Sequence, residues 1–139
     1  MTNLGPDLKS YEDLSDKQEK LLRQIHPDQF TVDGQPASSA FLPRASHAGL
    51  LSTRRQHIGA ERAFREWIEN HESRGTWGVT VGEVENASLR AFDDSNESDH
   101  PEGHASVDFN SLTTNGLQKR SARVLRDHAV KHGCLHPTS

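Results

Sequence analysis

Cysteine is nearly absent from this chain of 139 residues: Cys134 is the single one. An internal disulfide and a zinc site built from several cysteines are therefore excluded, and a reducing, cytoplasmic location is expected. No apolar run approaches the roughly 20 residues that span a bilayer. Residues 1–10 lack the basic and apolar segments of a signal peptide. The sequence thus predicts neither secretion nor a membrane partner.

Hydrophobic residues are also scarce, at 32%, but the formal net charge is only -4 at pH 7. Disorder requires low hydrophobicity together with high net charge, so the composition predicts a folded protein. The length is typical of one domain. Gly5-Pro6 and few apolar side chains predict a flexible lead-in over residues 1–14, followed by a single domain over residues 15–136.

Helical periodicity is strongest between Ala60 and His71, where apolar residues recur on one face up to a stop at Gly75. Its Phe64 and Trp67 are expected to be buried against the strands. A last helix, with Thr113 or Asn115 as its cap, is expected to end at Gly133 and to have an inward side formed by Leu117, Ser121, Val124, Leu125 and His128. A capping box at Ser15 and Gln18 predicts a third helix as far as Ile25, and a strand over residues 22–26 is the alternative.

Period-two alternation predicts strands at residues 77–81 and 105–109. Shorter extended segments are expected at residues 30–32, 38–42, 49–54 and 89–92, and residues 93–103 form an acidic loop. The partners expected for Phe64 and Trp67 are Trp77, Val79 and Val107. Together these segments predict an α+β fold, with a small, mostly antiparallel sheet packed against two or three helices.

His104, Ser106 and Asp108 alternate along one predicted strand, so all three point to one face. These are the residue types of a hydrolytic triad, but neighbours on one strand face lie about 6.5–7 Å apart, beyond hydrogen-bond reach. A solvated strand face is the favoured interpretation, and no catalytic residue is assigned.

Nine histidines raise the question of a metal. His128 and His132 are spaced for one helical face, and His100 and His104 have the same spacing in a loop. The sequence has no HExxH or CxxC motif, and histidines near a helix end stabilise its last carbonyls. We therefore predict no metal and no cofactor.

Small polar residues and aromatic anchors gather in residues 26–55, which predicts a binding face. Its candidate residues are His26, Phe30, Ser38, Ser39, Phe41, Ser52, Arg54 and Arg55. The two arginines precede a helix start, where backbone N–H groups favour anions, so they form either a phosphate or carboxylate site or a solvated pair. The last helix has a basic side that would suit nucleic acid, although a solvated face is favoured: Lys119, Arg120, Arg123 and Arg126.

The pattern His26-Pro27-x-x-Phe30, Asp33-Gly34, Ser39-Ala40-Phe41-x-Pro43 and Leu51-Ser52 resembles a group of small uncharacterised bacterial proteins. That resemblance implies a bacterial source and a single domain. Leu50-Leu51-Ser52 followed by Ala60-x-x-Ala63-Phe64 is similar to the centre of small ADP-ribosyltransferase folds. This second likeness implies that His26 and Ser52 occupy the first two catalytic places, and Asp108 replaces the Glu of the third.

Two functions are thus predicted. The first is a bacterial accessory or regulatory protein that binds a protein partner, encoded nearby, through residues 26–55. The second is a small nucleotide- or NAD-dependent transferase, or a hydrolase, that uses the same face. The first is favoured, because no residue set meets the geometry of a nucleophile with its base.

Overall fold

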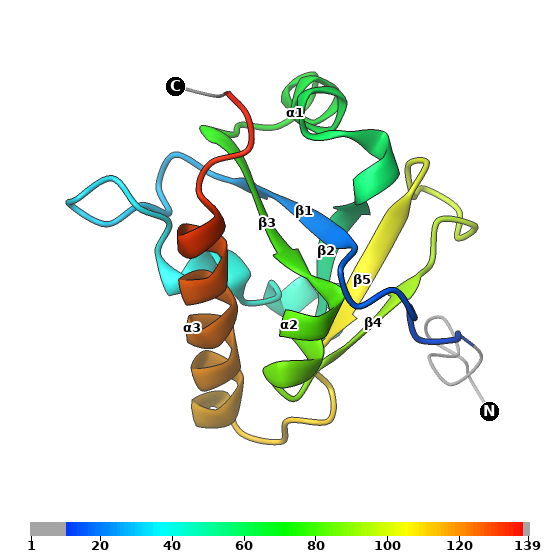
Figure 1. Cartoon of the computed structure of the whole chain (residues 1–139). Helices are drawn as coiled ribbons and strands as arrows, with labels where there is room; N and C mark the ends of the chain where they lie inside the picture. The colour runs from blue at the N-terminus through cyan, green and yellow to red at the C-terminus, as the bar shows by residue number, and fades with distance from the viewer. Residues whose placement is uncertain (1–10, 138–139) are drawn as a thin grey trace.

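The structure, a computed structural model, describes residues 11–137. Five strands form one antiparallel sheet in the order β3-β1-β2-β5-β4. The strands are β1 (Lys20–Ile25), β2 (Leu50–Arg55), β3 (Gly75–Thr80), β4 (Arg90–Asp93) and β5 (His104–Asp108). The helices are α1 (Ala60–Ile68), α2 (Val81–Asn86) and α3 (Asn115–His132), with 3-10 turns at Ser38–Phe41, Ala45–His47 and Gln56–Ile58. The predicted α+β fold is confirmed (Figure 1).

The first segment of the sheet, β1, corrects the predicted helix over residues 15–25. Leu21 and Leu22 are adjacent, and both are buried although they point to opposite faces. A central strand is buried on both sides, so its sequence lacks the alternation that identifies an exposed strand. The alternative prediction of a strand here was the correct one. β1 pairs with β3 along its whole length but with β2 only at Leu21 and Leu22, and beyond these residues the two strands diverge.

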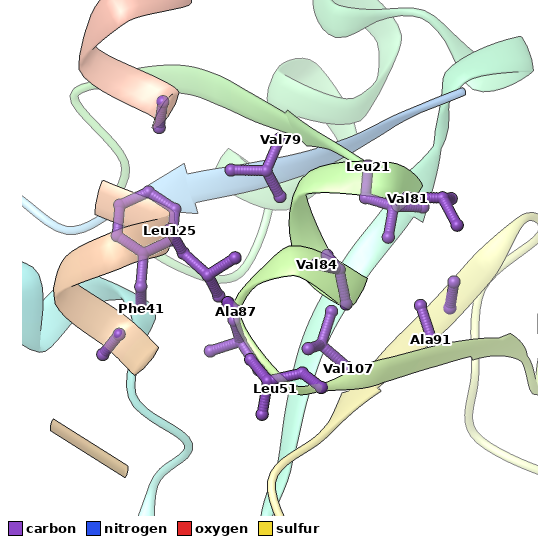
Figure 2. Packing of buried hydrophobic residues seen from close by; sticks show 14 of the residues in the cluster. Leu21, Phe41, Leu51, Val79, Val81, Val84, Ala87, Ala91, Val107 and Leu125 are labelled. Carbon is purple, nitrogen blue, oxygen red and sulfur yellow. The ribbon is translucent and has the colours of Figure 1, made fainter. Parts of the chain in front are cut away.

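The main core lies between one face of the sheet and the helices α2 and α3. Val79, Val107 and Leu51 come from three different strands, and Leu125 of α3 meets them with its side chain fully buried. Figure 2 shows these side chains converging with Phe41, which comes from the 3-10 turn Ser38–Phe41. This turn replaces the extended segment predicted for residues 38–42.

The other face of the sheet carries α1, which packs on β1 and β3. Ala63 is buried there against Leu22 and Ile58, while Phe64 and Trp67 stay half-buried. The predicted packing of Phe64 and Trp67 on strand residues is therefore wrong, because the partners belong to the main core on the other face: Trp77, Val79 and Val107. A strong helical period identified α1 but could not say which face of the sheet it covers.

Capping hydrogen bonds mark the starts of the two remaining helices, α2 and α3. α2 was not predicted, although Thr80 accepts from the Glu83 N–H and the Glu83 side chain accepts from the Thr80 N–H, which completes a capping box. The cap of α3 is Thr114, which accepts from Leu117 N–H, and not Thr113 or Asn115 as predicted, whereas Gly133 ends this helix as predicted. Leu117 itself is 43% exposed, so its predicted inward position is wrong.

Two outer segments differ from the sequence prediction. Residues 1–10 of the predicted lead-in lie outside the described residues, but Leu14 is buried and donates its N–H to Ala91 O, so packing begins before residue 15. The segment predicted as a strand at residues 30–32 forms a loop with a single bridge between Phe30 and Pro36. Its predicted turn at Asp33-Gly34 is present, with Gly34 at φ 82°. No helix within residues 11–137 has the length and apolar character to cross a membrane.

Candidate active site

A cavity of about 610 Å³ lies on the sheet face that α1 partly covers. Its floor consists of side chains from three strands: Gln24 from β1, Ser52 and Arg54 from β2, His104 and Ser106 from β5. One wall is α1, and another is the loop segment at residues 99–101. Cavities of this size accommodate small molecules, and the polar floor supplies several hydrogen-bonding groups.

The buried carboxylate of Asp94 connects two residues of this floor. His104 Nδ1 lies 2.6 Å from Asp94 Oδ1, and Ser106 Oγ donates to Asp94 Oδ2 at 2.6 Å. His104 and Ser106 are too far apart on their strand for direct contact, and Asp94 bridges the gap. The interpretation of this strand face as solvated is wrong: His104, Ser106 and Asp108 are all buried.

The protonation of this group follows from its hydrogen bonds. Burial alone would raise the pKa of Asp94, but the hydrogen bonds from His104 and Ser106 outweigh it and hold the pKa below its ordinary value. The ionised carboxylate accepts from Nδ1–H, which places the proton of a neutral His104 ring on Nδ1 and the lone pair on Nε2. Nε2 has no hydrogen-bond partner within residues 11–137, and the ring lines the cavity.

His100 completes a group able to hold a metal ion. Its ring stacks on His104 with centroids 3.9 Å apart, and its Nδ1 lies 2.9 Å from the Asp94 carbonyl oxygen. Ligand atoms of Asp94, His100 and His104 lie within 4.8 Å of one another. Because both Asp94 oxygens already accept hydrogen bonds, an ion between Asp94 and His104 would have to replace the 2.6 Å contact. The predicted absence of a metal stays a prediction.

Arg54 and Arg55 do not form the predicted joint anion site. Arg54 projects into the cavity wall, where it pairs with Glu66 of α1 at 2.9 Å and donates to Glu102 O. Arg55 points to the opposite face of the sheet and pairs with Glu19 at 2.8 Å and Asp93 at 3.0 Å. Neither interpretation from the sequence holds, because both arginines are paired and neither is a free surface residue.

The other predicted binding residues are divided among three places. Ser52 lines the cavity, and it also lines an adjoining hollow of about 390 Å³ together with His26. Phe41 is fully buried in the core, and Phe30 packs against that core edge-on to Trp77. Ser38 and Ser39 belong to the 3-10 turn and line neither hollow. The predicted single face over residues 26–55 therefore does not exist as such.

The catalytic set implied by the transferase likeness is also not brought together. Ser52 lines both hollows, whereas His26 lines only the smaller one. Asp108 lines neither hollow and lies 3.7 Å from Arg90.

The helix α3 carries the two remaining candidates. His128 and His132 both face the Glu83 carboxylate of α2, at 3.4 and 2.9 Å. These histidines thus attach α2 to the end of α3. On the basic side of α3, Lys119, Arg120 and Arg123 are exposed, while Arg126 donates to Pro36 O and contacts Asp127.

Sequence analysis did not identify Asp94, which holds His104 and Ser106 from behind the cavity, or Arg23 and Gln24, which line it. Asp94 lies in an acidic loop in which nothing distinguishes it from its neighbours, and Gln24 and Arg23 lie in a segment predicted as a helix. The alternation of His104 and Ser106, and the predicted binding residues Ser52 and Arg54, did point to this place. Comparisons with known protein families, with curated proteins and with solved structures find nothing that matches this chain.

Proposed function

We propose that this protein is a small acid–base enzyme, of the hydrolase or transferase class, whose cavity binds a small polar substrate. The observation that carries the proposal is the His104 ring, held by the buried Asp94 carboxylate and with Nε2 free at the cavity. A carboxylate that fixes the orientation of an imidazole is a common device of acid–base catalysis.

The proposed chemistry uses His104 as the group that carries the proton. Nε2 removes a proton from a hydroxyl or a water that attacks the substrate, and the same nitrogen returns this proton to the leaving group. Asp94 stabilises the imidazolium that exists between the two transfers without taking up the proton itself. Ser106 shares the Asp94 carboxylate and thereby keeps it from rotating. His100, stacked on His104, limits the ring to one orientation.

The partner-binding function predicted for residues 26–55 has less support. Phe41 has no exposed surface, and Arg54 and Arg55 are paired on opposite faces of the sheet. A partner would thus meet only part of the predicted set. The proposed substrate cavity is lined by Ser52 and Arg54 from that set, together with residues far beyond it in sequence.

The test is hydrolysis of three chromogenic substrates, p-nitrophenyl acetate, p-nitrophenyl phosphate and bis(p-nitrophenyl) phosphate. His104→Gln should lower kcat by about 100-fold or more on any substrate that is turned over, which is the range for loss of a general acid–base group. Glutamine is close in size to histidine and leaves the cavity largely filled. A circular-dichroism melt establishes that the variant is folded.

His47→Gln is the matched control, because His47 also lines the cavity but is exposed and has no carboxylate partner within residues 11–137. Its kcat should stay within about twofold of the parent protein. An equal loss of kcat in the two variants would contradict the proposed chemistry. So would a parent protein that hydrolyses none of the three substrates.

A further inference from the structure

Arg23 has an environment unlike that of the other half-buried arginines. Its guanidinium occupies the gap where β1 and β2 diverge, and it donates from Nε to Ala40 O at 2.9 Å and from Nη1 to Ser52 O at 3.0 Å. Both acceptors are backbone carbonyls. No carboxylate lies within ion-pair distance of Arg23 among residues 11–137.

The other half-buried arginines all have an acidic partner. The pairs are Arg54 with Glu66, Arg55 with Glu19, Arg62 with Glu66, Arg90 with Asp13 and Arg126 with Asp127. A buried cation loses the favourable free energy of solvation, and without a counter-ion no electrostatic attraction offsets this loss. Buried cations in proteins are therefore seldom unpaired. Burial, and next the positive charge of Arg44, lower the pKa of Arg23 to about 10. Its surroundings thus favour an added negative charge.

Gln24, the next residue, supplies a second unused donor at the same cavity. Its Oε1 accepts from Ser73 Oγ at 2.9 Å and from Thr76 Oγ1 at 3.0 Å, which fixes the direction of the amide. The residue is only 8% exposed, and its Nε2 atom is buried without a hydrogen-bond partner. A buried donor without a partner is unfavourable, and an acceptor on a bound ligand would satisfy it.

The adjoining hollow of about 390 Å³ is lined by Arg23, Gln24 and a second arginine, Arg44. Arg23 and Gln24 also line the main cavity. The acidic residue of that hollow is Glu72, which is 75% exposed and lies 3.2 Å from His26. The two arginines therefore meet no carboxylate there that would neutralise them.

We propose that Arg23, Gln24 and Arg44 form an anion subsite that receives a carboxylate or phosphate group of the substrate. The inference rests on the proposed function, since it assigns the reacting part of the substrate to His104 and its anionic part to the Arg23 end. An oxyanion accepts from the free edge of the Arg23 guanidinium and from Gln24 Nε2–H, and Arg44 contributes charge from the rim.

Binding of the free anions tests this subsite without any turnover. Inorganic phosphate and acetate are titrated separately into the ¹⁵N-labelled protein, and the side-chain amide signals of Gln24 are followed. At least one anion should bind saturably and shift these signals. Tighter binding of phosphate assigns a phosphorylated substrate, and tighter binding of acetate assigns a carboxylate; either result supports the subsite.

Two variants locate the bound anion. Arg44→Gln removes an exposed charge and leaves the fold intact, and it should raise the Kd about tenfold, as expected for a charge-assisted contact. Arg23→Lys keeps the charge but loses the planar fork, and it should raise the Kd by a similar factor. Arg65→Gln is the control, because Arg65 is an exposed arginine of α1 that pairs with Glu61 and lines neither hollow.

The outcomes separate this subsite from the chemistry at His104. The anion should bind His104→Gln as it binds the parent protein. If neither anion shifts the Gln24 signals, or if Arg44→Gln and Arg65→Gln weaken binding equally, the subsite is refuted, even where His104→Gln abolishes turnover. Anion binding in a protein without turnover would instead refute the proposed reaction alone.

Discussion

The carboxylate of Asp94 is the most informative single group to change, and Asp94→Asn is the substitution of choice. Asparagine has nearly the same shape, so packing is preserved while the charge is lost. Its amide oxygen can accept from His104 Nδ1–H. Its NH2 group then lies beside Ser106 Oγ, in the place of the carboxylate oxygen that accepted the Ser106 hydrogen bond. We expect the variant to fold and to be less stable than the parent protein.

The size of the loss follows from the two hydrogen bonds. A hydrogen bond to a charged group contributes about 1.5–3 kcal/mol and a neutral one about 0.5–1.5 kcal/mol, so two bonds lose about 2 kcal/mol. Removing a buried charge returns part of this, since the Asp94 side chain is only 1% exposed. The expected net loss is about 1–2 kcal/mol. Asp94→Ala leaves both donors unsatisfied and should cost about 3–5 kcal/mol.

Urea unfolding at several pH values measures the effect and its cause. The pKa of Asp94 is lowered in the folded protein, so the folded state binds this proton less tightly than the unfolded state. Its stabilisation is thus fully present above the unfolded pKa, about pH 4, and is lost as the pH falls through the lower folded pKa. The difference between the parent protein and Asp94→Asn should be constant near neutral pH and shrink below about pH 4.

Asp99→Asn is the matched control, because Asp99 lies in the same loop, is exposed and has φ 75°, a conformation that asparagine tolerates well. It should change the free energy of unfolding by about 0.5 kcal/mol or less. If the loss in Asp94→Asn is as large at pH 3 as at pH 7, the stabilisation does not come from the charge, and the argument for an ionised Asp94 fails.

Three further outcomes are expected. Leu125→Ala, in the core, should lower the free energy of unfolding by about 2–5 kcal/mol, and the exposed Leu117→Ala by about 0.5 kcal/mol or less, as compared by urea unfolding. Arg54→Ala should cost about 1–3 kcal/mol because its side chain is 11% exposed and ion-paired, whereas Ser39→Ala should cost about 0.5 kcal/mol or less; equal losses would contradict this placement. Metal analysis of untagged protein should find no stoichiometric zinc, and one ion per chain that disappears in His100→Ala would instead identify a metal site.

Sequence periodicity identified the helices and strands that have one apolar and one polar side. α1, α3 and β5 each have one apolar side, and their positions were close to those in the structure. β1 was predicted as a helix because it is central and buried on both faces, so its adjacent leucines mimic a helical pair. α2 was missed because its cap, Thr80, also ends a convincing alternating strand.

The site was only partly visible in the sequence for a related reason. His104 and Ser106 were recognised as one strand face, but distance along the strand argued against a shared function. The residue that unites them, Asp94, comes from an acidic loop, and its burial depends on β4 pairing with β5. Long-range pairing of this kind leaves no local pattern in the sequence. Neither the Asp94–His104 pair nor the gap that holds Arg23 could therefore be inferred.

The order of the strands has a consequence for how the chain folds. β4 and β5 follow one another closely along the chain, whereas β1 pairs with β3 through contacts such as Ile25 with Gly75, and with β2 through Leu21 with Arg55. Closing such long loops costs chain entropy before any contact compensates for it, which slows folding. We expect the β4–β5 hairpin to form early and the central strand late. The cavity floor would then be assembled in one of the last folding steps, when β1 joins the sheet between β2 and β3.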